Sequence, residues 1–274
     1  PDLMGVVERR VKGTRGSHST APWWQLERLR PELYRAISQF SRTIANCQVG
    51  PHLSFAFVST NTVYSHTLNA FALPNYSSFA VLQSRPHEIW ARFFGSSMKD
   101  DLRYTPSDCF ETFPFPENWE SHAALEAVGK TYYEYRAALM VRNNEGLTKT
   151  YNRFHDPEEH DLEIVKLRDL HTAMDRAVLD IYGWADIPTA CEFLLDYEID
   201  EDEWGHRKKP YRYRWPDEVR DEVLARLLAL NAERAKAESL AGPSAAKTKT
   251  KVAKASSART ERRRPGDETG DLFR

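Results

Sequence analysis

The chain has 274 residues with 38 Lys and Arg against 40 Asp and Glu, and 41% of its residues are hydrophobic. This apolar content suffices for one large domain or two small ones, but the longest uncharged apolar stretches are far short of a membrane span and no basic-then-apolar signal opens the chain. Three scattered cysteines without a Cys-x-x-Cys pair argue against a zinc module or a disulfide framework, and they fit a reducing cytoplasm. Since the sequence opens on Pro1 rather than Met, we expect a piece of a longer protein.

The net charge of −2 hides an asymmetry between the body and the tail. Residues 241–274 hold nine basic and four acidic residues, so the tail carries about +5 and the remaining 29 basic and 36 acidic residues give the body about −7. A basic tail can bind nucleic acid. A solubilising disordered end explains the same composition, and charge does not decide between the two interpretations.

The first half is predicted to be rich in strands. Residues 1–20 are polar and read as an arm or loop, and Leu33, Ile37, Phe40 and Ile44 recur at helical spacing within 30–47. Aromatic and β-branched runs then predict two neighbouring strands and a third short one, at 54–60, 62–73 and 78–84. A helix is expected at 85–96, with Pro86 in its first turn and Gly95 at its end.

The second half is predicted to be helical. We expect helices at 123–144, 155–184 and 215–238, followed by a disordered tail. In the middle one, Asp156 is the expected N-cap and Gly183 the expected stop. The sequence therefore predicts an α+β protein with four parts, which are an arm (1–20), a strand-rich domain (21–116), a helical region (117–240) and a basic tail (241–274).

The segment Leu102–Pro116 (LRYTPSDCFETFPFP) joins the two halves. It is too rich in proline for a helix or a central strand and too aromatic for a solvated linker. Proline fixes φ and removes a backbone donor, so we interpret the segment as a rigid structural exit whose phenylalanines contact both halves.

No catalytic constellation stands out. The acidic and histidine residues at 155–160 lack His-Glu-x-x-His spacing and suit a helix start, His171 suits a helix face, and Cys109 has no nearby histidine as a base. The sequence contains no Gly-x-Gly loop for a nucleotide or S-adenosylmethionine and no Asn-Pro dipeptide. We therefore predict no catalytic residues, no metal and no cofactor in this chain.

Residues 79–116 resemble the end of the target-recognition domain in large bacterial adenine-specific DNA methyltransferases, namely the fused type IIG and type IIL restriction-modification enzymes and their relatives in BREX and DISARM phage defence. The motif positions that carry the resemblance are Leu82, Ser84, His87, Trp90, Gly95, Lys99, Asp101, Arg103, Tyr104, Thr105, Phe113, Pro114, Phe115 and Pro116. Flanking stretches extend it over roughly residues 20–240. The catalytic domain that precedes this region in the family, with its cofactor loop and Asn-Pro-Pro motif, is missing here.

The resemblance implies the DNA sequence-recognition part of a site-specific adenine-N6 methyltransferase. It implies double-stranded DNA and a catalytic domain or subunit as partners, and S-adenosylmethionine as the cofactor of the parent enzyme. Candidate DNA contacts are the basic and polar residues around the motif: Gln83, Arg85, His87, Arg92, Lys99, Arg103 and Tyr104.

Several alternatives remain open at this point. Arg103 and Tyr104 fit a packed motif as well as a contact, Lys99 fits a phosphate contact better than base reading, and bases are expected to be read from Ser59–His66 or Asn75–Ser77. The rival interpretation is a helical protein-interaction scaffold of a defence complex, and a third is a degenerate remnant of a longer gene. The ending Asp271-Leu272-Phe273 faintly resembles sliding-clamp-binding peptides.

Overall fold

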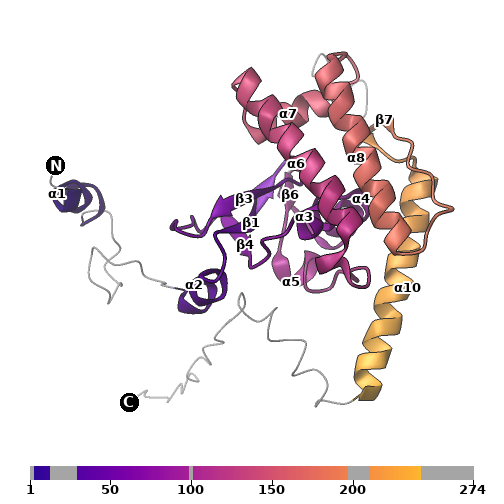
Figure 1. Cartoon of the computed structure of the whole chain (residues 1–274), viewed down its shortest axis with the longest axis horizontal. Coiled ribbons are helices and arrows are strands. Elements are labelled where there is room, and N and C mark those ends of the chain that lie inside the picture. Colours follow the sequence, from indigo (N-terminus) through magenta and orange to yellow (C-terminus); the bar gives the residue numbers. More distant parts are fainter. Residues whose placement is uncertain (1–2, 13–29, 99–100, 197–209, 242–274) are drawn as a thin grey trace, which may run out of the picture.

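The structure is a computed structural model and describes residues 3–12, 30–98, 101–196 and 210–241. In Figure 1 the strands of the first half lie toward the left of the body, whereas the last long helices lie on its right, next to strand β7. The strands are β1 (Arg42–Cys47), β2 (Val49–Gly50), β3 (Phe55–Ser59), β4 (Leu68–Phe71), β5 (Ser96–Met98), β6 (Asp101–Arg103), β7 (Glu192–Leu195) and β8 (Tyr211–Arg214). The main helices are α2 (Pro31–Ile37), α3 (Tyr76–Gln83), α4 (Arg85–Phe94), α5 (Pro106–Cys109), α6 (Ala123–Asn143), α7 (Leu147–Phe154), α8 (Leu162–Ile181) and α10 (Asp217–Ala241). None of these helices is both long and apolar enough to cross a membrane.

The first sheet corrects one expectation about the order of its strands and one about where a helix ends. Its strands are ordered β3-β1-β4, with both outer strands antiparallel to β1, so β1 separates the two strands that we expected to be neighbours. β1 also falls where a helix was predicted, because the helix ends at Ile37. Thr43 to Asn46 are all buried, so β1 is covered on both faces, and a strand covered in this way need not alternate. The helical spacing of Ile44 with earlier apolar residues was therefore misleading.

The strand predicted at 78–84 is wrong, because this segment forms helix α3. Residues 77–83 are all buried, and an apolar run without periodicity cannot be assigned to a strand or a helix from spacing alone. Helix α6 packs directly against α3. A Cβ added at Gly129 of α6 would lie 2.2 Å from the backbone oxygen of Tyr76, so glycine permits this close approach.

The helix expected at 85–96 is confirmed as α4, with proline in its first turn and Gly95 directly after its last residue. A second sheet follows, ordered β2-β6-β5. The exit segment was expected to exclude both a central strand and a helix, and both exclusions are wrong. The segment begins within β6, the central strand of this small sheet, and Pro106 then opens the four-residue helix α5, where a proline at the first position costs no hydrogen bond.

The end of the exit segment contacts both halves of the protein. The ring of Phe113 packs edge-on against His87 of α4, with centroids 4.6 Å apart. On the other side, Tyr182 donates a hydrogen bond to the carbonyl of Pro114 at 2.9 Å, and Arg234 donates one to the carbonyl of Phe115 at 2.6 Å. These contacts hold the exit in one place between the sheets and the last helices.

In the helical half, α6 and α10 lie close to their predicted ranges, whereas the helix expected at 155–184 begins later. Asp161, not Asp156, caps α8, and its side chain accepts a hydrogen bond from the backbone of Glu163 at 2.9 Å. Gly183 follows that helix with φ 76°, as a stop signal requires. The sequence pattern did not predict α7 or the β7–β8 hairpin.

The structure describes part of the N-terminal arm but not the basic tail after residue 241. The arm or loop expected at 1–20 is helical where it is described, as α1 (Leu3–Val7) and the π-helical turn η1 (Glu8–Lys12). The basic tail lies outside the described residues from 242 onward, and so does the peptide-like ending Asp271-Leu272-Phe273.

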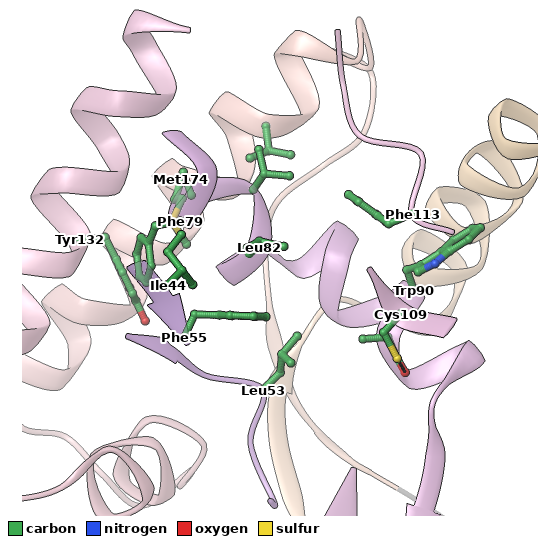
Figure 2. Close-up of a cluster of buried hydrophobic side chains, with 14 of the residues drawn as sticks. Ile44, Leu53, Phe55, Phe79, Leu82, Trp90, Cys109, Phe113, Tyr132 and Met174 are labelled. Atoms are coloured by element: carbon green, nitrogen blue, oxygen red, sulfur yellow. Dashed lines mark hydrogen bonds between the residues drawn. The ribbon is translucent and has the colours of Figure 1, made fainter. Parts of the chain in front are cut away.

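A single hydrophobic core runs through both halves. Figure 2 shows Ile44 and Phe55 of the first sheet together with Tyr132 of α6 and Met174 of α8, and all four are buried. A first half of short strands and short helices and a mainly helical second half therefore share one core. The fold is α+β, as predicted.

Candidate nucleic-acid interface

The connection from β3 to β4, residues 60–67, is called the crossover here. Because both strands are antiparallel to β1, the chain must run back along the length of β1 to join them. Hydrogen bonds fix the two ends of the crossover at opposite ends of β1. At the start, Thr60 donates to the carbonyl of Phe40 at 2.6 Å, and at the end the amide of Gln48 donates to the carbonyl of Thr67 at 2.8 Å.

The middle of the crossover is held by aromatic packing against α2. The rings of Tyr64 and Tyr34 stack with centroids 6.2 Å apart and an interplanar angle of 8°. The hydroxyl of Tyr64 donates to the carbonyl of Ser59 at 2.7 Å. With Tyr64 turned inward, the other side chains after Thr60 are exposed, namely Asn61, Thr62, Val63, Ser65, His66 and Thr67. The crossover is thus a surface segment with an anchored backbone.

This surface carries no formal charge apart from histidine. Residues 43–84, which include all of the crossover, contain no Asp, Glu, Lys or Arg. Its exposed groups are instead the amides, hydroxyls, imidazole and methyl groups that pair with base edges in a DNA groove. Such a surface adds little sequence-independent attraction to phosphates, because that attraction comes from Lys and Arg.

Free arginines flank the crossover. Among residues 30–98, 101–196 and 210–241, the arginines whose side chains form no hydrogen bond, ion pair or ring contact are Arg30, Arg35 and Arg103, and all three are exposed. Arg30 and Arg35 bracket the start of α2, whose Tyr34 stacks on the crossover. Arg103 lies beyond the other end, because Gln48 joins the carbonyl of Thr67 to the amide of Tyr104 through two 2.8 Å hydrogen bonds. Cations are therefore available on both sides of a neutral segment.

Four of the seven predicted contacts lie instead in a buried polar seam between the sheets and the helices, formed by Gln83, Arg85, His87 and Tyr104 together with Arg136 and Asp175 of the helical half. The side-chain oxygen of Gln83 accepts from the amide of Phe55 at 3.0 Å and from Arg136 at 3.2 Å. Arg136 also donates to the carbonyl of Phe55 at 2.6 Å. The side-chain nitrogen of Gln83 donates to the carbonyl of Leu53 at 3.1 Å, so both polar ends of this side chain are bonded inside the protein.

Arg85 forms the ionic centre of the seam. Its guanidinium is paired with the carboxylate of Asp175 and lies 2.8 Å from Nδ1 of His171. Burial disfavours the charged guanidinium, but the neighbouring Asp175 outweighs it, so the pKa of Arg85 is raised. Burial likewise opposes ionisation of Asp175, yet His171 and Arg85 hold the pKa of this carboxyl below its ordinary value. The pair is charged and internal, so Arg85 stabilises the fold.

His87 and Tyr104 form a second buried contact, with Nε2 and the hydroxyl oxygen 2.9 Å apart. Burial lowers the pKa of His87 to about 3, so the imidazole is neutral at physiological pH. A neutral, enclosed histidine cannot attract a phosphate. The packed-motif alternative is thus the better description of Tyr104, whose side chain is 2% exposed.

The remaining predicted contacts divide into three cases. Arg92 is half-buried and donates to Glu88 at 2.9 Å, so its charge is matched inside the protein. Lys99 lies outside the described residues. Arg103 is exposed and unpaired, as a phosphate contact requires. Of the seven, Arg103 alone stays a described candidate for direct contact.

The two segments expected to read bases also differ. Asn75 is exposed but donates to the carbonyl of Glu120 at 3.2 Å, and buried Ser77 donates to the same carbonyl at 2.8 Å. The segment 75–77 is therefore tied to the start of the helical half. The segment 59–66 coincides with the exposed crossover.

No alternative chemistry emerges among the described residues. They contain no group of three or more His, Cys, Asp or Glu side chains placed to hold a metal ion. Buried His155 accepts a hydrogen bond from the amide of Tyr213 at 3.1 Å. Burial raises the pKa of Cys109 to about 11, which suits a packed thiol and not a nucleophile.

Sequence reasoning missed Arg30 and Arg35, because it concentrated on basic residues next to the motif. A usable signal was present. The uncharged run of residues 43–84 is preceded by Arg30, Arg35 and Arg42 and followed by Arg85, and the structure removes Arg42 and Arg85 from the set by packing them internally.

Comparison with known proteins finds that this chain is similar to a family model and to a solved structure. Residues 30–117 match the family model of the MmeI target recognition domain. A structure of the type IIL restriction-modification enzyme MmeI in complex with DNA aligns with 72% of this chain at 18% identity and a TM-score of 0.45. This chain spans 22% of that enzyme's length. The comparison with curated proteins found no match.

Proposed function

We propose that this chain is the DNA sequence-recognition part of a site-specific adenine-N6 DNA methyltransferase that belongs to a restriction-modification or phage-defence system. The observation that carries the proposal is the match of residues 30–117 to a target recognition domain, within which an anchored, neutral crossover is exposed between free arginines. A catalytic domain or subunit outside this chain would hold S-adenosylmethionine and transfer the methyl group.

The division of labour follows from the chemistry of base methylation. The amino group of adenine is not accessible to a transferase pocket while the base is stacked, so the target base must leave the duplex. Holding the duplex from a second side offsets part of that cost. In this proposal the crossover contacts base edges, while Arg30, Arg35 and Arg103 contact phosphates and fix the register.

The charge pattern makes the proposal quantitative. Each phosphate contact contributes about −0.9 to the slope of log K against log salt, so the three described arginines together contribute about −2.7. This is a weak electrostatic grip. The chain would then owe its preference for a site to base contacts, and the catalytic part would supply further affinity.

The test is selection of purified chain on random duplex DNA at two salt concentrations, followed by sequencing of the retained DNA. Enrichment of a short motif at the higher salt supports a recognition module. Binding that depends on salt without any enrichment would mean that the chain grips DNA generically. Absence of binding at either salt would contradict the proposal for the isolated chain.

A second candidate is a protein-interaction scaffold within such a defence complex. It is favoured by an apolar surface on the helical half, where Val141 of α6 and Leu162 of α8 are each 81% exposed. Arg142 and Glu163, the residues that follow them, form an ion pair, so the two apolar side chains lie on adjacent helix ends. Loss of partner binding in Val141→Ser and Leu162→Ser variants that still bind DNA would establish this role alongside recognition.

A further inference from the structure

We propose that Val63 reads a thymine methyl group in the recognised DNA, and that it therefore determines specificity at one base position. This inference rests on the proposed function and adds to it one residue, one ligand group and one type of contact. Val63 lies near the middle of the crossover and its side chain is 65% exposed.

The surroundings distinguish Val63 from an ordinary exposed apolar residue. Single exposed apolar side chains are common on protein surfaces. In the described part of residues 30–117, however, the exposed large hydrophobic side chains are Val63, Phe93 and Phe94, and Val63 is the one within the uncharged polar crossover. Its neighbours Thr62, Ser65 and His66 offer hydrogen-bonding groups, so Val63 supplies the apolar contact that a thymine methyl needs beside them.

The backbone at Val63 is held in place before any ligand binds. The next residue, Tyr64, is fixed by its stack on Tyr34 and by its 2.7 Å hydrogen bond to the carbonyl of Ser59. The side chain of Val63 has a single rotatable χ1 that is stiff because of β-branching. An apolar group presented in this way loses little conformational entropy on contact.

The chemical class of the contacted group follows from size and shape. The apolar side chains that wedge between base steps are Phe, Leu, Ile, Met and Pro, and valine is not among them. A compact, branched side chain instead fits beside the C5 methyl of thymine, which is the apolar feature of the major groove. Removing one methyl from such a contact costs about fourfold in affinity, by the transfer free energy of one methylene.

The experiment pairs a protein change with a base change. After selection has given the bound sequence, each thymine is replaced in turn by deoxyuridine, which lacks the methyl, and binding is measured by fluorescence anisotropy with the full chain. We expect one position at which the replacement weakens binding of the unaltered chain about fourfold and leaves binding of Val63→Ala unchanged. The Val141→Ala variant, altered at an exposed valine far along α6, should keep the full sensitivity.

The outcomes separate this inference from the proposed function. Selection that enriches no sequence overturns the proposed function and this inference with it. An enriched sequence whose uracil effects are the same in Val63→Ala and in the unaltered chain overturns the inference and leaves the recognition function standing. Thermal unfolding of Val63→Ala checks that the exposed substitution leaves the fold intact.

Discussion

The crossover lies on the surface of the first half, the buried polar seam joins the two halves, and the two regions use polar residues in opposite ways. The seam holds charged and amide side chains, and its carboxylate, Asp175, is fully buried. The crossover holds no Asp, Glu, Lys or Arg, and its side chains other than those of Thr60 and Tyr64 are exposed. The predicted DNA contacts that lie in the seam therefore stabilise the fold, and the neutral residues of the crossover form the exposed surface.

The difference has a physical origin in the contact between β3 and the helices. The amide and the carbonyl of Phe55 in β3 are buried, and buried backbone groups require partners. Gln83 accepts a hydrogen bond from the amide of Phe55, and Arg136 donates one to its carbonyl. The polar groups of these two side chains are therefore used inside the protein. The backbone of the crossover is instead satisfied at both ends, because the amide of Thr60 donates to the carbonyl of Ser41 and the carbonyl of Thr67 accepts from the amide of Gln48. Its exposed side chains therefore stay available.

The strongest way to break the seam is Asp175→Ala. The substitution leaves the guanidinium of Arg85 buried without its carboxylate, and loss of one partner of a buried pair costs about 3–5 kcal/mol of unfolding free energy. Urea denaturation measures the effect. Asp180→Ala, which breaks the exposed ion pair with Arg176, should cost less than about 1 kcal/mol. Equal losses in the two variants would show that the seam is no more stabilising than the surface.

The seam should also make stability depend on pH. Burial lowers the pKa of His87 to about 3, whereas histidine in an unfolded chain titrates near 6.5. Below pH 6.5 the unfolded chain binds a proton that the folded chain does not, so this contribution is complete above that pH and is lost as the pH falls towards 3. For His87 alone, the loss between pH 7 and pH 5 is about 2 kcal/mol.

The variant that checks this pH dependence is His87→Phe, which removes the titrating group but keeps a ring in the core. We expect its stability to fall less steeply with acid, with the remaining slope due in part to His155, whose pKa is also lowered by burial. Tyr104→Phe is the matched control. It removes the hydroxyl beside His87 but not the burial that shifts the pKa, so its acid slope should stay the same. A Tyr104→Phe chain with a flattened slope would contradict burial as the cause.

A smaller effect is expected where α6 meets α3. In Gly129→Ala the new Cβ would meet the backbone oxygen of Tyr76, and the helices must separate. Overpacking of this kind costs about 1–3 kcal/mol, and the better helix propensity of alanine offsets part of it, so we expect a net loss of about 1–2 kcal/mol. At Gly146, nothing lies within 4 Å of an added Cβ, and Gly146→Ala should therefore unfold close to the unaltered chain in thermal melts.

The sequence predicted the elements whose signals are local and failed where burial removed those signals. Helix α4 was predicted because Pro86 and Gly95 mark its ends, and Gly183 marked the end of α8. β1 and α3 were misassigned because both are buried on all sides and show no usable periodicity. For the interface, residue type pointed to Arg85 and His87, but whether a polar group is free depends on long-range contacts. The partners of Arg85 and Gln83 lie 90 and 53 residues further along the chain, at Asp175 and Arg136.

The last prediction tests whether the free arginines that flank the crossover contact DNA phosphates, which the buried arginines of the seam cannot do. In Arg103→Ala and Arg35→Ala, binding should weaken for enriched and unrelated DNA by the same factor, and each variant should flatten the slope of log K against log salt by about 0.9. Arg142→Ala is the matched control, because this exposed arginine of α6 is neutralised by Glu163. Since phosphates carry no sequence information, a change in the enriched sequence of Arg103→Ala would instead place that residue on a base edge. The neutral crossover and the charged side chain of Arg103 would then both contact base edges, and Arg103 would no longer count among the residues that contact phosphates.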